Sequence, residues 1–240
     1  MPFISSRGRT GFGRTKAAPA PTPGAYTITA GTKAPVGSAG MTSVTMPTTG
    51  STDDGFTSTT LANNFNFYGT GYTTVYAGTN TYLTFGSGAT NYSSLSLGPS
   101  AIPAVRAIHL GSSDNSSQVF FRQAGTNYTR LRYQGTNTTN PLSGTAIIYE
   151  VRFFNQVVGT DDIYVEIVFG THGQTGGVWG ITNGAASGAT FTSFGGLTAG
   201  TGLVGTSGAL AQNQSYVLVL TSTGAFKNLY AGYYISTVVT

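Results

Sequence analysis

Residues 128–133 read Tyr-Thr-Arg-Leu-Arg-Tyr, and residues 163–170 read Ile-Tyr-Val-Glu-Ile-Val-Phe-Gly. In both stretches polar residues alternate with apolar ones, which is typical of a β-strand with one buried face. Similar short runs recur from residue 25 onward, separated by clusters of Gly, Asn and Ser. No helical pattern extends beyond about two turns. The sequence therefore predicts an all-β fold: a single antiparallel β-sandwich preceded by an extended N-terminal arm.

The runs that we predict to be strands share a content of Thr, Tyr, Val, Ile and Phe. They are Tyr26–Thr29, Ser43–Met46, Phe65–Tyr68, Tyr72–Tyr76, Thr81–Phe85, Gln118–Arg122, Tyr128–Tyr133, Ala146–Phe154, Ile163–Phe169, Val178–Thr182, Thr190–Phe194, Tyr216–Thr221 and Tyr230–Val239. The stretch 183–212, which is rich in Gly, Ala and Thr, is predicted to form long loops.

The composition is polar but poor in ionised groups. Charged residues make up 8% of the chain, against about a quarter in ordinary globular proteins. Threonine outnumbers even the 35 glycines, while 14 Tyr and 14 Phe provide apolar bulk for a core. The chain has no cysteine, which excludes a disulfide framework, a thiolate metal site and a cysteine nucleophile.

The N-terminal residues, Met-Pro-Phe-Ile-Ser-Ser-Arg, have no apolar run behind their charges, so we expect no signal peptide. No run of about 18 apolar residues predicts a membrane span either. A composition suited to an exposed surface, without a route for export, indicates a protein that is made in a host cytoplasm and deployed on virions after lysis.

The positive charge belongs to the N-terminus. Residues 1–33 contain five basic residues and no acid, whereas six basic and seven acidic residues leave the remainder at −1. We expect residues 1–24 to form an extended basic arm with a proline linker and residues 25–240 to form the sandwich. The arm could be a disordered tail, but aromatic residues among arginines favour a peptide that docks on a partner. The residues predicted to dock are Phe3, Ile4, Arg7, Arg9, Phe12, Arg14 and Lys16.

Over residues 53–185 the chain resembles the nidogen-like extracellular domain. The resemblance rests on Phe-Asn-Phe-Tyr-Gly at 65–69, on residues 72–86, where Thr81 replaces the family's usual Gly, and on strands like the family's closing pair at Ile147–Phe154 and Asp162–Phe169. The family's Trp-x-Asp segment is missing, because residues 109–114 read His-Leu-Gly-Ser-Ser-Asp. The aromatic residues that carry this resemblance are packing residues and imply no catalysis.

Residues 113–121 and 128–135 are similar to domains in virion structural proteins of tailed phages that infect cyanobacteria. The opening MPFISSRG, followed by Gly-Phe-Gly-Arg, resembles a start peptide that several such proteins share. This likeness implies an anchor followed by a displayed module.

Candidate chemistry is sparse. Asp53–Asp54 and Asp161–Asp162 are adjacent pairs. We interpret them as solvated loop residues and not as calcium ligands, because the sequence has no EF-hand spacing. His109 lies in an apolar, strand-like setting and is interpreted as a core residue, while His172 lies in a turn. A triad of Ser112, His109 and Asp114 lacks a nucleophile elbow. We expect no enzyme activity, no catalytic residue, no metal site and no cofactor.

The leading functional hypothesis is a phage virion structural protein displayed on the particle exterior, on the capsid, neck or tail. Its partners would be other virion structural proteins, and it would be a homo-oligomer. The alternative is a host-surface glycan-binding module of a fibre, in which Tyr92 and Trp179 would stack on sugars. Nucleic-acid contact through the basic arm ranks last, because the body offers no second basic patch.

Overall fold

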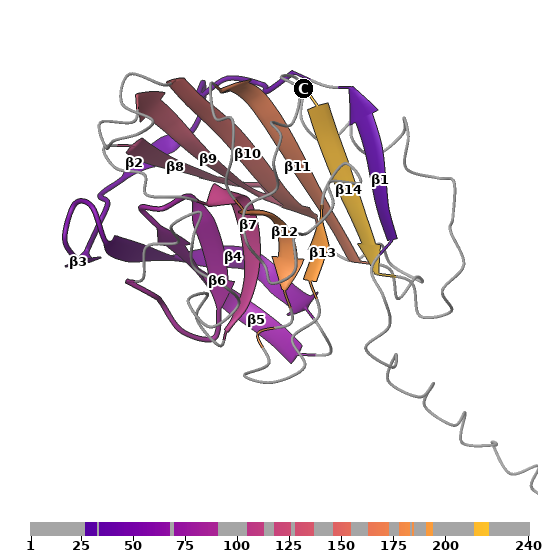
Figure 1. The fold of residues 1–240 in the computed structure, drawn as a ribbon, viewed down its shortest axis with the longest axis horizontal. Helices are drawn as coiled ribbons and strands as arrows, with labels where there is room; N and C mark the ends of the chain where they lie inside the picture. Colours follow the sequence, from indigo (N-terminus) through magenta and orange to yellow (C-terminus); the bar gives the residue numbers. More distant parts are fainter. Residues whose placement is uncertain are drawn as a thin grey trace, which may run out of the picture.

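The computed structural model describes residues 27–32, 34–67, 70–90, 105–112, 118–125, 128–136, 146–154, 163–172, 178–182, 184, 191–193 and 214–220. Within them all regular structure is β-strand, and the strands form two antiparallel sheets packed together as a sandwich, as the sequence predicted (Figure 1).

Sheet A contains seven strands in the spatial order β1–β14–β11–β10–β9–β8–β2. Their bounds are β1 Thr27–Thr32, β2 Thr42–Val44, β8 Gln118–Ala124, β9 Tyr128–Thr136, β10 Ala146–Phe154, β11 Ile163–His172 and β14 Gln214–Leu220. β1 and β2 follow one another in the sequence but lie at opposite edges of this sheet, so the chain between them crosses it.

Sheet B contains seven strands in the order β13–β12–β7–β6–β5–β4–β3. Their bounds are β3 Thr49–Gly50, β4 Gly55–Phe67, β5 Thr70–Gly78, β6 Tyr82–Phe85, β7 Arg106–Ser112, β12 Val178–Thr182 and β13 Phe191–Ser193. In Figure 1 the two sheets are separate layers, with β8–β11 in one and β4–β7 in the other.

The core lies between the sheets and follows the two-residue period of each strand. Along β10, Ile147, Tyr149, Val151 and Phe153 all face inward and are buried, while the intervening residues face outward. Phe153 inserts into the aromatic cluster of sheet B, with its ring 4.9 Å from that of Phe65. Burying each such side chain contributes about 2–3 kcal/mol, so this interior holds the two layers together.

Polar contacts also join the layers. The hydroxyl of Tyr133 donates to the carbonyl of Tyr82 over 2.9 Å, and the amide of Ala62 donates to the Thr129 hydroxyl over 2.7 Å. Burial raises the pKa of the Tyr133 hydroxyl well above its usual value, so it stays a neutral donor. These bonds fix the lateral position of one sheet on the other.

Several strands extend beyond their predicted runs, and β3 lies outside all of them. β4 begins at Gly55, ten residues before the predicted Phe65, because its inward positions there carry Thr57 and Thr59, which are buried although they are polar. β7 was anticipated only as the strand-like setting of His109. The predicted strand Tyr230–Val239 and most of the predicted loop stretch 183–212 lie outside the described residues.

Thr81 explains one departure from the resembled pattern. It occupies the turn between β5 and β6 with a φ of 57°, in the left-handed region that favours glycine. Its amide donates to the Gly78 carbonyl, and its own carbonyl accepts from the amide of Leu110 over 3.0 Å. The backbone at this position therefore has the conformation that a glycine would adopt without strain.

Candidate functional site

The predicted docking residues of the arm, Phe3, Ile4, Arg7, Arg9, Phe12, Arg14 and Lys16, lie outside the described residues. The first described element after the arm is β1, an edge strand of sheet A that pairs with β14 from Thr27–Val219 to Thr32–Gln214. Whatever the arm contacts, its path into the sandwich therefore runs through this edge.

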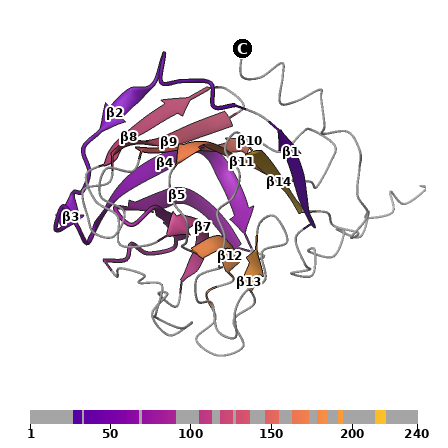
Figure 2. The ribbon, with the colours of Figure 1, turned by 45° about the horizontal axis from the view of Figure 1, so that its top comes forward.

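After β1 the chain crosses the outer face of sheet A. We name residues 34–41 the crossing segment; Figure 2 shows this connection arching over the sheet from β1 to β2. The amide of Val36 donates to Oε2 of Glu150 over 3.3 Å, and Nη2 of Arg130 donates to the Ala39 carbonyl over 3.4 Å. Glu150 and Arg130 are outward-facing residues of β10 and β9, so the crossing segment is attached to the middle of the sheet.

The close packing of the crossing segment depends on small residues beneath it. A Cβ added at Gly170 of β11 would lie 2.5 Å from Cγ of Pro35, which no real contact tolerates. The amide of Met41 donates to the Ser38 carbonyl over 3.0 Å and closes a turn around Gly40, whose φ is 74°. Gly40 therefore allows the chain to turn toward β2.

Beneath the crossing segment lies a buried group of five ionised side chains, which we name the ionic cluster. Each belongs to the outer face of β9, β10 or β11, and none is more than 5% exposed. The members of the ionic cluster are Arg130, Arg132, Glu150, Arg152 and Glu166.

Strand register creates the ion pairs of the cluster. Glu150 lies opposite Arg132 across β9–β10, and Arg152 lies opposite Glu166 across β10–β11. Nη1 of Arg132 donates to Oε1 of Glu150, Nη2 of Arg152 donates to Oε2 of Glu150 over 2.9 Å, and Nη1 of Arg152 donates to Oε2 of Glu166. Glu150 also receives the Val36 amide, so it links the cluster to the crossing segment.

None of these five residues was predicted from the sequence to be part of a site. A signal was present: five of the 18 charged residues of the chain occupy alternate positions in the three strands β9, β10 and β11. In a chain with so few charges, ionised residues of both signs on the outward positions of successive strands indicate pairing across a sheet.

Asp53 and Asp54 lie in the turn between β3 and β4. The Asn80 side-chain amide donates to Oδ1 of Asp54 over 2.9 Å, and the Asp54 amide donates to the Ser51 hydroxyl over 2.8 Å. The Thr79 hydroxyl donates to the Asp53 carbonyl. These contacts tie the β3–β4 turn to the β5–β6 turn, a structural role. The described residues contain no group of three or more His, Asp or Glu that could hold a metal ion.

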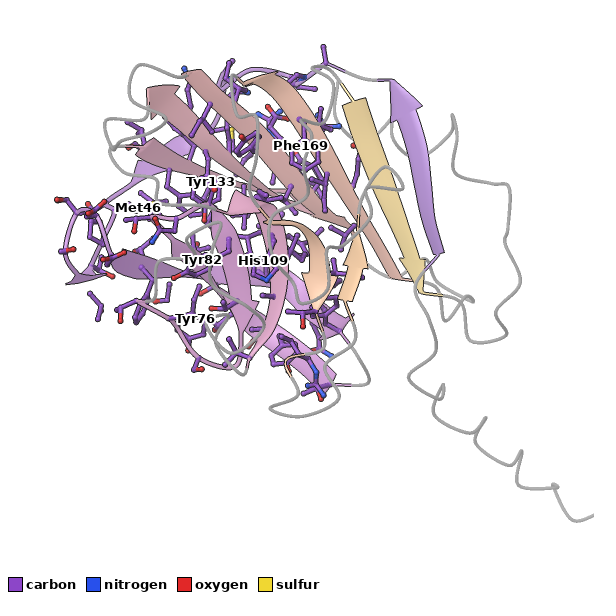
Figure 3. The ribbon with its side chains drawn as sticks, in the orientation of Figure 1. Met46, Tyr76, Tyr82, His109, Tyr133 and Phe169 are labelled. Carbon is purple, nitrogen blue, oxygen red and sulfur yellow. The ribbon has the colours of Figure 1, made fainter. Side chains whose placement is uncertain are left out.

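His109 is buried in β7, with 2% of its surface exposed, as the core interpretation predicted. It lies opposite Tyr82 of β6, and the two rings are 6.3 Å apart (Figure 3). Burial lowers the pKa of His109 to about 3, so the imidazole is neutral at physiological pH. A general base should have a pKa near the working pH, and this imidazole does not.

The other candidates are described in part or not at all. Asp114, Asp161, Asp162 and Tyr92 lie outside the described residues, and for Ser112, His172 and Trp179 only the backbone is described. The prediction of a turn at His172 was wrong, because this residue is the last of β11 and pairs with Ile147 of β10. Within the described part of the chain, no helix has the length and apolarity needed to cross a membrane.

No protein-family model, no curated protein and no solved structure matches this chain. The resemblances to nidogen-like domains and to phage virion proteins therefore stay predictions from the sequence.

Proposed function

We propose that this chain is a structural protein of a tailed-phage virion, displayed on the particle exterior and attached through residues 1–24. The observation that carries the proposal is the separation of charge: residues 1–33 hold five basic residues and no acid, while the remainder is at −1. A nearly neutral sandwich preceded by a basic N-terminal stretch is suited to a displayed module with its own anchor.

Attachment would rest on binding energy. Phe3, Ile4 and Phe12 would fill apolar pockets of another virion protein, and Arg7, Arg9, Arg14 and Lys16 would meet carboxylates or carbonyls. Ordering such an arm costs about 1–2 kcal/mol per residue, so one arm alone would hold weakly. In a homo-oligomer several arms act together, and the raised effective concentration makes attachment durable.

The arrangement of sheet A supports an anchored role. The arm leads into β1 at the sheet edge, and the crossing segment then ties the same stretch of chain to Glu150 and Arg130 in the middle of the sheet. Force applied to the arm would therefore be distributed over β14, β10 and β9 and would not act on a single hairpin. A separate proline linker, with Pro19, Pro21 and Pro23, would keep the arm extended.

The test is deletion of residues 1–24. We expect the truncated protein to keep the circular dichroism spectrum and melting temperature of the full chain, because the described strands begin at Thr27. It should be missing from purified particles when it is expressed during infection in place of the full chain. Normal incorporation of the truncated protein would overturn the proposal.

A further inference from the structure

The charges of the ionic cluster do not cancel. The cluster holds three arginines and two glutamates, and both glutamates are already engaged by Arg132 and Arg152. Among the residues that the structure describes, the guanidinium of Arg130 reaches no carboxylate. Its hydrogen bond goes to the Ala39 carbonyl at 3.4 Å, which is long for an N–H donor.

Arg130 is also removed from water. Only 2% of the residue is exposed, and its buried Nε has no hydrogen-bond partner within the part of the chain that the structure describes. Burial, opposed by the attraction of Glu150, lowers the pKa of its guanidinium. An unpaired buried cation costs several kcal/mol, so this position has a strong preference for an anion.

We propose that Arg130 is a binding site for an oxyanion: either the carboxylate of an acidic side chain or a small inorganic anion such as sulfate or phosphate. The ligand would approach at the turn 38–41, where Ala39 and Gly40 are exposed, and would replace the Ala39 carbonyl as the acceptor. The planar guanidinium can donate two parallel bonds to such a group. This inference does not rest on the function proposed for the arm, and with the ligand bound the Val36 amide would still tie the crossing segment to Glu150.

Gln123 is a second donor at the same place. It lies opposite Arg130 across β8–β9, on the same face of the sheet. Its side-chain nitrogen lies next to Gly40, since a Cβ added at Gly40 would come within 3.2 Å of Nε2. A guanidinium and an amide on one side, under a short exposed turn, provide neutralising charge and directed donors for two oxygens of the ligand.

The first experiment compares two arginines of the ionic cluster in a chloride buffer of low ionic strength. Arg130→Met removes a charge that meets no carboxylate of the described residues, so we expect an unchanged or higher melting temperature. Arg152→Met leaves Glu150 and Glu166 buried with a partner removed, so we expect the melting temperature to fall by roughly 6 °C or more. Equal losses in the two variants would mean that the charge of Arg130 is already compensated, which would overturn the proposal.

The second experiment titrates sodium sulfate and sodium acetate separately against the intact protein, with chloride keeping the ionic strength constant. We expect a saturable rise in melting temperature of about 3 °C at ten times the dissociation constant. The rise should be absent in Arg130→Met and retained in Arg122→Met, which removes a half-buried arginine of β8 that lies on the opposite face of the sheet and donates to the Thr60 carbonyl. General salt effects on hydrophobic burial act on all three proteins and are subtracted by this comparison.

The two salts distinguish the sources of the anion. Saturation by acetate at lower concentration than sulfate would assign the site to a carboxylate of a protein, and the reverse order would assign it to a sulfate- or phosphate-like group. A rise that persists unchanged in Arg130→Met, or no saturable rise with either salt, would overturn the proposal.

Discussion

At the residue scale, two buried side chains of sheet B show how a polar residue is tolerated in this fold. Thr81 adopts a φ of 57° in the turn between β5 and β6, and His109 is enclosed in the neighbouring strand β7. Thr81 strains the backbone, and burial of His109 removes a titratable group from water. Both have consequences for stability that can be measured.

Thr81→Gly should leave the free energy of unfolding unchanged or raise it by up to about 1 kcal/mol, because it relieves the cost of a β-branched residue at positive φ. The matched control is Thr84→Gly in β6, where the hydroxyl donates to the Ser87 carbonyl over 2.7 Å. That change should cost more than about 1 kcal/mol. The comparison is made by urea denaturation. A loss at Thr81 as large as that at Thr84 would show that side-chain contacts outweigh the backbone strain.

His109 should make the fold sensitive to acid. Its pKa is about 3 in the folded protein and about 6.5 in the unfolded chain. As pH falls below 6.5, protons therefore bind the unfolded state first, and stability that is complete above pH 6.5 is lost progressively down to about pH 3. The slope should approach about 1.4 kcal/mol per pH unit.

The measurement is the free energy of unfolding of the native chain and of His109→Gln between pH 6.5 and 5, where most carboxylates stay ionised. The variant should lose most of this slope, whatever its absolute stability. His172→Gln, at the other histidine of the chain, serves as the control. An unaltered slope in His109→Gln would contradict the assignment of this pH dependence to His109.

At the scale of the elements, alternation predicted the strands β9 to β12 well, but it missed β7 although Ile108 and Leu110 of that strand lie in the core. β10 and β12 have the predicted bounds, and β9 and β11 begin at the predicted residues. It failed at the start of β4, since Thr57 and Thr59 face the core there and Gly, Ser and Thr resemble a turn. The crossing segment could not be predicted, because it depends on β1 and β2 lying at opposite edges of sheet A.

The ion pair between β10 and β11 should show strong coupling. Arg152→Met leaves two buried glutamates short of a partner and should lower the free energy of unfolding by about 3–5 kcal/mol. Glu166→Leu should lower it less, because Arg152 remains paired with Glu150 at 2.9 Å. The double variant leaves Arg132 and Glu150 paired. It should therefore be more stable than the sum of the single losses by at least about 2 kcal/mol. Urea denaturation of all four proteins provides the cycle, and additive losses would mean that the pair is not coupled.

At the scale of the whole molecule, the sequence predicted the fold class but not the ionic cluster. The sandwich follows from local alternation, whereas the cluster follows from strand order and register, which bring Arg132, Glu150 and Glu166 from three strands onto one face. The predicted docking residues of the arm lie outside the described residues. The division into a basic arm and a neutral body is, however, visible in the sequence itself, and it leads to a test of what the arm recognises.

If the arm docks on protein, its apolar side chains should matter at least as much as its charges, because desolvated aromatic residues dominate binding in grooves while exposed charges contribute little. Changing Phe3, Ile4 and Phe12 to Ala should then weaken attachment to particles more than changing Arg7, Arg9 and Arg14 to Gln. Raising the salt from about 0.1 M to 0.5 M should weaken it only modestly, since apolar contacts are not screened.

An arm that binds nucleic acid behaves in the opposite way: affinity falls by orders of magnitude with salt, and the arginines dominate. Titration of the two triple variants and the native chain against particles at both salt concentrations separates these outcomes. Dominance of the arginines together with a steep salt dependence would favour nucleic-acid binding over protein docking. We expect the aromatic residues to account for most of the binding.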